Sequence, residues 1–401
     1  MFGKGILDGV RVLGIEQQVA APYCTMMLSD QGAEVIKVER TGMGDSAREM
    51  APILQKGDKS TSGYFTRFNR NKKSVTIDFG KPEGVEVLKG LIAKSDIIVE
   101  NFKPGMMDKF GLSYDVVKEI NPGAVYVAIS GFGRLSSKQG PYSERLAYDI
   151  VAQAMGGLMH LAGQKGGPPT WLGVAIGDVV TGVYAAYAAL LGYIKRLKTG
   201  KGDFFDVSMY DCMIALAERA HNVYSWTGKI LERGPDPLIC PWGPFEAKDG
   251  FVALIVPTQD SWVKFCKALG RPDLVTEELN SGPKRAAKLD YLMPIIKEWM
   301  SSKNREEVCD ILMKEGLPCG PVQHSEDITN CPHVKAREMF INIPDKVMGE
   351  ITMVGSPYKM ADSQVTYGPV PLLGEHTDKI LTELLNYDAA KLSALRASKI
   401  I

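Results

Sequence analysis

The chain has 401 residues, of which 45% are hydrophobic, and its 47 basic and 47 acidic side chains cancel to a formal net charge of zero. This length predicts two or three domains with large apolar cores, and the balanced charge argues against nucleic acid or a membrane surface as the main partner. The seven cysteines form no C-x-x-C pair, and the N-terminal residues lack the apolar core of a signal peptide. We therefore expect a reduced, cytoplasmic protein without a structural zinc site.

Short β-rich runs alternate with helical patterns through the first 135 residues. The runs cover residues 10–16, 34–40, 96–100 and 124–130. Such alternation predicts an α/β fold in which helices cover both faces of a parallel, Rossmann-like sheet. The first run is followed by "EQQVAAP" instead of G-x-G-x-x-G, and the chain contains no P-loop sequence. A nicotinamide or flavin cofactor is therefore disfavoured.

Two apolar helices are predicted next, over about 179–197 and 207–227, with the loop "KTGKGDFF" between them. Asp178 is the one acidic residue of the run before Lys195. The uncharged stretch 179–194 is shorter than the ~20 residues that a bilayer requires, so a buried helix is expected. From the local pattern alone, Asp178 is interpreted as the N-cap of that helix.

The composition changes after residue 227. Residues 228–260 are rich in Pro, Gly and aromatic side chains and contain a "KDG" turn, which predicts a smaller domain that opens with short strands. Helical patterns follow over 263–270 and 305–316. A return segment begins near 330, with a helix expected in 331–340, a strand in 349–357 and helix in the last 25 residues.

Eight collinear motifs then identify a family. They are "GAEVIKVER", "NRNKKSVTIDFGKPEG", "VENFKPG", "YDIVAQAMGG", "GDVVTG", "TGKGDFFDVSMYD", "GLPCGPV" and "PLLGEHTDKIL", spread over residues 32–381. In this order they resemble the class III coenzyme A transferases of CaiB/BaiF type, the family of formyl-CoA transferase and carnitine CoA-transferase. The resemblance covers nearly the whole chain.

The resemblance implies an architecture that periodicity does not show. The large Rossmann-like domain would consist of both chain ends, 1–227 and 329–401, with a smaller α+β domain over 228–328. Two ring-like subunits would interlock as a homodimer, and each active site would lie between the large domain of one subunit and the small domain of the other.

The resemblance also makes Asp178 the catalytic nucleophile. The matching aspartate of the family attacks an acyl-CoA thioester to give a mixed anhydride, and the CoA thiolate then forms an aspartyl-CoA thioester that a free carboxylic acid resolves. A carboxylate suits this exchange because an acid that replaces another acid changes the free energy little. An apolar setting would protect the intermediates from water. Acyl-CoA is thus expected as substrate, with no metal or redox cofactor.

Sixteen further positions match the coenzyme A contacts of the family. They are Val19, Ala20, Arg40, Ile77, Asp78, Phe79, Gly80, Asn101, Phe102, Lys103, Lys109, Arg145, Leu146, Ala147, Tyr148 and Asp149. The local alternative for Tyr148 and Asp149 is a core-facing tyrosine and a helix-capping aspartate. For each lone Lys or Arg in this set, the alternative to a coenzyme A contact is a solvated surface charge.

Two other functions stay open. Acyl-CoA racemases or epimerases of the same fold carry a histidine where this chain has Tyr148, which disfavours that activity. A non-catalytic CoA-binding protein is the third hypothesis. Formyl-CoA transferase has a lysine ahead of the Y-[DE] pair where this chain has Leu146, preceded by Arg145. Its mobile glycine run is replaced by residues 236–250, so formate/oxalate exchange is disfavoured and a larger or less polar acid is expected.

Overall fold

The computed structural model describes residues 5–401, which form two compact units. The large unit comprises the chain up to residue 159 together with 171–230 and 338–401; the small unit comprises 160–170 and 231–337. Along the chain, the large unit gives way to the small unit between residues 230 and 231, and the small unit gives way to the large unit again between residues 337 and 338. The domain boundaries expected after residues 227 and 328 stay a prediction.

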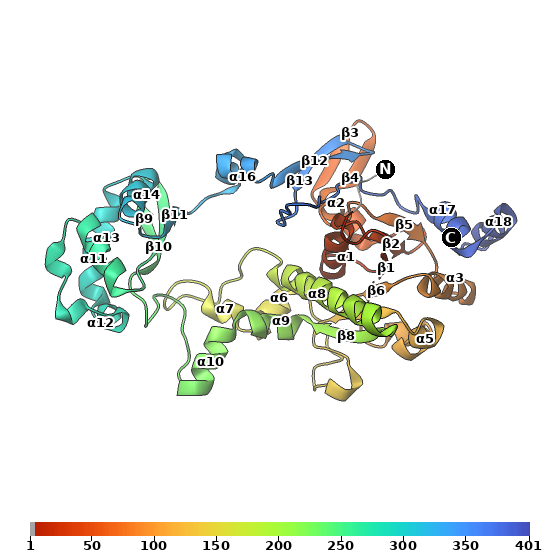
Figure 1. Ribbon diagram of the computed structural model, residues 1–401, viewed down its shortest axis with the longest axis horizontal. Coiled ribbons are helices and arrows are strands. Elements are labelled where there is room, and N and C mark those ends of the chain that lie inside the picture. The colour runs from red at the N-terminus through yellow and green to blue at the C-terminus, as the bar shows by residue number, and fades with distance from the viewer. Residues whose placement is uncertain (1–4) are drawn as a thin grey trace. The chain divides into compact units, whose positions relative to one another are not determined.

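A six-stranded parallel sheet forms the centre of the large unit (Figure 1). Its strand order is β5-β2-β1-β6-β7-β8. The strands are β1 Arg11–Ile15, β2 Glu34–Glu39, β5 Lys73–Thr76, β6 Ile97–Glu100, β7 Val125–Ser130 and β8 Asp203–Ser208. The four strands predicted from sequence are confirmed, whereas β5 was not predicted and β8 occupies part of the predicted "KTGKGDFF" loop.

Alternate side chains of these strands enter two separate cores. Val12 and Ile97 face α1 and α8, whereas Leu13 and Ile98 face the opposite layer. That layer contains α3, α5, α17 and α18, so the C-terminal helices complete one face of a sheet that the N-terminal half begins. The predicted coverage of both faces is confirmed. The helices are α1 Ala20–Asp30, α8 Ile176–Thr199, α3 Pro82–Ala93, α5 Tyr114–Ile120, α17 Thr377–Leu385 and α18 Ala389–Ala397.

Helix α8 lies close to the sheet because small residues line its inner face. A Cβ atom at Gly192 would come within 2.3 Å of Val125, and one at Gly182 within 2.7 Å of the Ala20 carbonyl oxygen. The helix has 24 residues and is therefore longer than predicted; by length and composition alone it could cross a bilayer. Its inner face nevertheless packs on α1, α9, β7 and β8, as a core helix does.

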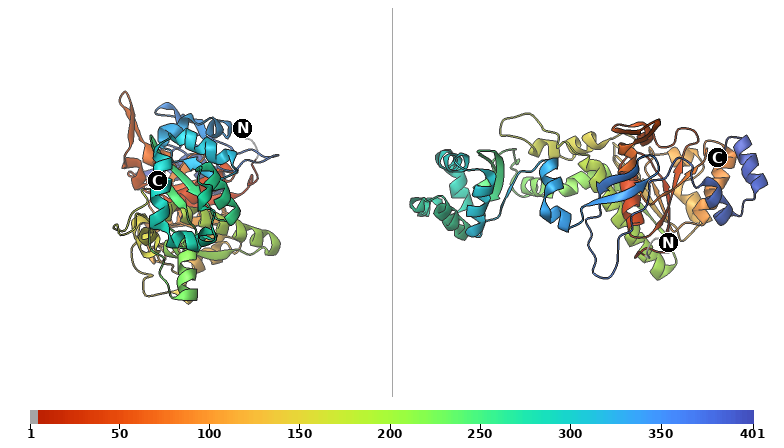
Figure 2. Two further views of the ribbon diagram at one scale, coloured as in Figure 1. Left: turned by 90° about the vertical axis from the view of Figure 1, so that its left-hand side faces the viewer. Right: turned by 90° about the horizontal axis from the view of Figure 1, so that it is seen from above.

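Shorter elements complete the large unit. They are η1 Ser46–Glu49, β3 Ile53–Lys56, β4 Lys59–Ser62, α2 Gly63–Thr66, α4 Met106–Lys109, η2 Ser136–Lys138, α6 Asp149–Met155, α9 Met209–Leu216, α10 Glu218–Thr227, β12 Phe340–Asp345 and β13 Gly349–Val354, with α7 Leu158–Leu161 at the change of unit. The β3–β4 hairpin lies beside the β12–β13 hairpin (Figures 1 and 2), where Lys56 Nζ donates to the Met348 carbonyl oxygen at 2.8 Å.

The small unit has its own antiparallel sheet and core. Its strands are β9 Trp242–Ala247, β10 Gly250–Ile255 and β11 Cys319–Pro321, and its helices are α11 Gln259–Ala268, η3 Pro272–Leu274, η4 Glu277–Leu279, α12 Gly282–Ala287, α13 Leu289–Ser301, α14 Arg305–Lys314, α15 Ser325–Asn330 and α16 Pro332–Ala336. Buried Trp262 anchors the core. The short strands predicted at the start of this domain are confirmed and pair as β9 and β10. The helix expected over 331–340 ends at Ala336, and β12 begins at Phe340.

Candidate active site

The strand order of the large sheet reverses between β1 and β6. In open α/β sheets, ligands bind at the carboxyl ends of the strands beside such a reversal. Segments that follow β1, β6 and β7 line a pocket of about 270 Å³ there. The N-terminal turn of α8 closes it with Asp178. The full lining is Gln17, Gln18, Val19, Ala20, Ser46, Tyr64, Asn101, Phe102, Lys103, Pro104, Ile129, Ser130, Gly131, Arg145, Leu146, Ala147, Tyr148, Asp178 and Met209.

The loop between β1 and α1 is held by side chains from neighbouring loops. Asn101 accepts a hydrogen bond from the Gln17 N–H at 3.0 Å and donates one to the Gln17 carbonyl at 2.8 Å. Gln18 has a positive φ of 65°, and its N–H donates to Asp45 at 3.1 Å. Asn101 therefore fixes the pocket wall with its side chain.

Beneath this loop lies a buried network of four charged side chains. Lys37 pairs with Asp45 at 2.9 Å, and Lys72 pairs with Glu16 at 2.7 Å. Burial lowers the pKa of Lys72 to about 8. Two positive and two negative groups balance within the network, so its partners compensate much of the cost of taking each charge out of water. The network joins β1, β2 and the residues before β5, and Asp45 connects it to the Gln18 backbone in the pocket wall.

Asp178 is the third residue of α8, whose N-cap is Ala175. The prediction that Asp178 is the N-cap is therefore wrong. The helix start is instead capped from α6, where Asp149 accepts a hydrogen bond from the Gly177 N–H at 2.7 Å and one from Gln153 Nε2 at 2.8 Å. A carboxylate on a neighbouring element thus does the capping that frees Asp178.

The Asp178 carboxyl is half-buried, and its pKa is raised. Burial, with the negative charge of Asp149 as the second cause, raises its pKa to about 7, while Arg67 opposes the rise. Within residues 5–401, no hydrogen bond to this carboxylate is formed. The group is therefore a weakly solvated carboxylate, close to half-ionised at neutral pH, which can act as a nucleophile or a proton acceptor.

Tyr64 in α2 and Arg67, the residue that follows α2, were not predicted from the sequence. The Arg67 guanidinium stacks 3.9 Å from the Tyr64 ring centroid and 4.5 Å from that of Phe68. Burial raises the pKa of the Tyr64 phenol; Arg67 opposes that rise and the Asp178 charge adds to it. No sequence motif marks these residues, because only the tertiary fold brings α2 close to the N-terminal end of α8.

Most of the expected site residues meet at this pocket. Tyr148 lines it and is 73% exposed, so the alternative of a core-facing tyrosine is wrong. Asp149 lies outside the lining and caps α8. The residues that the structure brings together with Asp178 are Val19, Ala20, Asn101, Phe102, Lys103, Arg145, Leu146, Ala147 and Tyr148.

Other expected contacts lie outside the pocket. Ile77 and Phe79 are buried in the core, which leaves only their backbone for a ligand. Arg40 follows β2 and Asp78 and Gly80 follow β5, so they lie along the same carboxyl edge of the sheet. Lys109 is exposed on α4.

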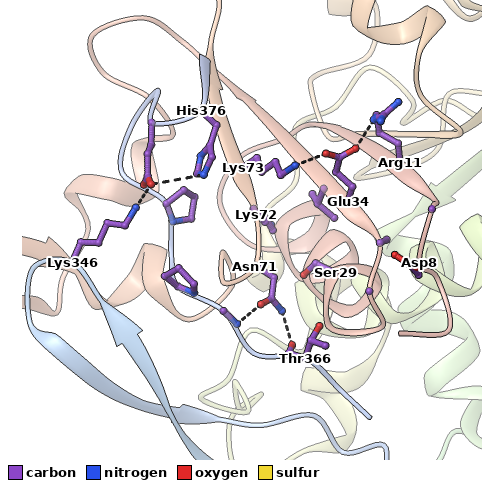
Figure 3. Close-up of a pocket in the computed structure, with 18 residues that line it drawn as sticks. Asp8, Arg11, Ser29, Glu34, Asn71, Lys72, Lys73, Lys346, Thr366 and His376 are labelled. Atoms are coloured by element: carbon purple, nitrogen blue, oxygen red, sulfur yellow. Dashed lines mark hydrogen bonds and ion pairs between the residues drawn. The ribbon is translucent and has the colours of Figure 1, made fainter. Parts of the chain in front are cut away.

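A different cavity, of about 460 Å³, opens at the amino ends of β1, β2 and β5 (Figure 3). Its charges pair with one another: Glu34 binds both Arg11 and Lys73. Burial and then the charge of Lys346 lower the pKa of His376 there to about 4. The cavity lies at the edge of the sheet opposite Asp178, and its internally paired charges make it the weaker candidate.

No histidine lines the Asp178 pocket, and residues 5–401 contain no cluster of three or more metal-ligating side chains. The chemistry that the described side chains offer is that of a carboxylate near a helix N-terminus, with Lys103 and Arg145 available to an anionic ligand.

Comparisons with known proteins indicate one family over most of the chain. The model of CoA-transferase family III matches residues 7–377. The succinyl-CoA:mesaconate CoA-transferase of Haloarcula hispanica is 39% identical over 94% of this chain and 96% of its own length, and the human succinyl-CoA:glutarate CoA-transferase is 34% identical over 98% and 90%. The crystal structure of a CaiB/BaiF family protein from Brucella suis is 33% identical, with a TM-score of 0.83 over 95% of this chain and all of the other.

Proposed function

The chain belongs to CoA-transferase family III and is a CoA-transferase, and we propose that Asp178 is the nucleophile that carries the acyl group and then the CoA group between a donor acyl-CoA and a free acid. The observation that carries the proposal is the Asp178 carboxylate itself, which is half-buried, free of hydrogen bonds within residues 5–401 and located at the reversal of strand order.

The reaction requires no net proton transfer. A carboxylate oxygen of Asp178 bonds to the thioester carbonyl carbon and the C–S bond breaks, which gives a mixed anhydride and CoA thiolate. The thiolate attacks the aspartyl carbonyl, forms the aspartyl-CoA thioester and releases the donor acid. The acceptor carboxylate attacks that thioester to form a second anhydride, and the thiolate then takes the acceptor acyl group and regenerates Asp178.

Coenzyme A is proposed to bind as a substrate along the carboxyl edge of the sheet. Helix α1 begins at Ala20 without a side-chain cap, so its first N–H groups are available to polar groups of the pantetheine arm. Lys103 and Arg145 line the pocket, and the exposed Arg40 and Lys109 lie farther out. Such cations suit the nucleotide phosphates. We propose no metal or redox cofactor.

An interlocked homodimer is proposed from the family architecture, with the outer face of α8 as support. Seven large apolar side chains on this face are exposed: Val183, Tyr184, Tyr187, Leu190, Leu191, Ile194 and Leu197. Their spacing of three and four residues places them on one side of the helix. Apolar patches of this kind are typical of protein interfaces. A cytoplasmic location remains part of the same proposal.

We propose dicarboxylic acids as substrates. The two relatives described above are named for succinyl-CoA as donor and for mesaconate or glutarate as acceptor. Acids of this size agree with the expectation of an acid larger than formate or oxalate.

The test is incubation of the purified enzyme with succinyl-CoA, followed by peptide mass spectrometry. A hydroxylamine-sensitive adduct is expected at Asp178, and new thioesters should form with a panel of dicarboxylic acids. An Asp178→Ala variant with normal turnover would contradict the mechanism. Deuterium incorporation from solvent into the α-carbon of a branched acyl-CoA, without an acceptor acid, would instead support racemisation.

A further inference from the structure

A second cavity, of about 550 Å³, lies beside Asp178 in the large unit and is called here the Arg67 pocket. Most of its wall is apolar, from Tyr23 and Met26 of α1, Phe68 after α2, and Met353 of β13. Val179, the residue after Asp178, contributes to it as well. The pocket could therefore hold the acyl part of a substrate that reacts at Asp178.

Three charged side chains line this pocket, and two of them neutralise each other. Arg70 donates to both oxygens of Asp30, at 2.8 and 2.5 Å, and also to the Val354 carbonyl at 2.9 Å. The Arg67 guanidinium stacks on Tyr64 and Phe68 and forms no ion pair within residues 5–401, the described part of the chain. Arg67 is the cation that a ligand carboxylate could bind.

The two pockets lie on either side of the first turn of α8, one lined by Asp178 and the other by Val179. Tyr64 and Asp178 line the pocket that contains the expected coenzyme A contacts, whereas Arg67 and Val179 line the second. When a carboxylate attacks a thioester carbonyl, the sulfur and the acyl chain extend from the reacting carbon in different directions. With CoA in the first pocket, the acyl chain is directed toward the second.

We propose that Arg67 binds the distal carboxylate of a dicarboxylic acyl group in the Arg67 pocket and makes the enzyme selective for dicarboxylic over monocarboxylic acids. This inference rests on the proposed function, because it assumes that Asp178 is the reacting carboxylate. It assigns a specificity-determining residue, since a guanidinium forms strong, oriented hydrogen bonds with a carboxylate. The apolar wall would contact the methylene carbons between the two acid groups.

The test compares succinyl-CoA with butyryl-CoA, which has the same chain length and no second carboxylate. Arg67→Met keeps the apolar stem and removes the charge. We expect the ratio of kcat/KM for succinyl-CoA to that for butyryl-CoA to fall about 10- to 150-fold, the range for a hydrogen bond to a charged group. Loss of the Arg67 charge, which opposes the raised pKa of Asp178, lowers both values alike. Arg67→Lys should retain part of the preference for succinyl-CoA over butyryl-CoA.

A second test uses the wild-type enzyme, so its result does not depend on whether a variant folds. The amide analogue of succinyl-CoA has the same shape as succinyl-CoA without its charge, and its kcat/KM is expected to be at least about tenfold lower. Equal rates for acid and amide, or an equal loss for succinyl-CoA and butyryl-CoA in Arg67→Met, would overturn the role of Arg67. If the proposed function itself is wrong, the wild type forms no Asp178 adduct with any of these thioesters.

Discussion

Replacing Asp178 by Asn should abolish turnover and stabilise the folded protein, with a gain that depends on pH. The carboxyl pKa is about 7 in the fold, against 3.8 for an unperturbed aspartate. Since the folded pKa is raised, the folded state binds the proton more tightly, and the stability of the wild type falls as pH rises from about 4 to 7. Asparagine has no charge to desolvate.

The size of the gain follows from the pKa difference. The shift of roughly 3 pKa units, at 1.36 kcal/mol each, makes ionised Asp178 cost about 4 kcal/mol at pH 8. At pH 5 the folded carboxyl is protonated, and the cost relative to the unfolded chain is about 2 kcal/mol. The free energy of unfolding of Asp178→Asn should therefore exceed that of the wild type by these amounts.

Urea unfolding at pH 5 and pH 8 measures the two differences. Asp115→Asn is the matched control, because Asp115 also lies in the first turn of a helix, α5, but is exposed. It should change stability by less than about 0.5 kcal/mol at either pH. A gain for Asp178→Asn that is the same at both pH values, or no gain, would refute the electrostatic account of this site.

Three further changes test other parts of the account. Asp149→Asn removes the second cause of the raised Asp178 pKa, so the acid limb of kcat/KM should move below about 7 in a pH–rate profile; an unmoved limb contradicts that coupling. Asn101→Ala removes two hydrogen bonds to the Gln17 backbone and should weaken CoA binding about tenfold by calorimetry, while unchanged affinity would mean that the loop holds its shape alone. Because interlocked subunits cannot separate while folded, Tyr187→Glu on the outer face of α8 should lower the melting temperature of the dimer; Lys198→Glu, at an exposed position on the same helix, should not, and an unchanged melting temperature of Tyr187→Glu would exclude this face as the interface.

The parallel sheet was predictable because its strands are buried on both faces. Val12 and Leu13 enter opposite cores, so β1 appears in the sequence as a continuous apolar run, and β6 and β7 do the same. Strand β8, "DFFDVS", lies at the sheet edge and is only partly buried. It lacks that signal and was assigned to a loop.

The site was predictable where the chain matches the motifs of the family: Val19 and Asn101 were expected from that resemblance, and both line the pocket. Arg67 could not be found this way, since its position beside Asp178 depends on the packing of α2 against other elements. The cap of α8 shows the same limit. Asp178 has the residue type and position of an N-cap, but the hydrogen bond to Gly177 comes from Asp149, 28 residues earlier in the chain.

The central claim is that an Asp178 oxygen enters the exchange. The most direct measurement is turnover with succinyl-CoA and an acceptor acid labelled with ¹⁸O in its carboxylates, followed by mass analysis of the peptide that contains Asp178. The account predicts that Asp178 acquires one labelled oxygen in a single turnover and up to two over many turnovers, because each second anhydride leaves its bridging oxygen on the aspartate, and that no label enters when the acyl-CoA is omitted. Turnover that leaves Asp178 unlabelled would contradict the account.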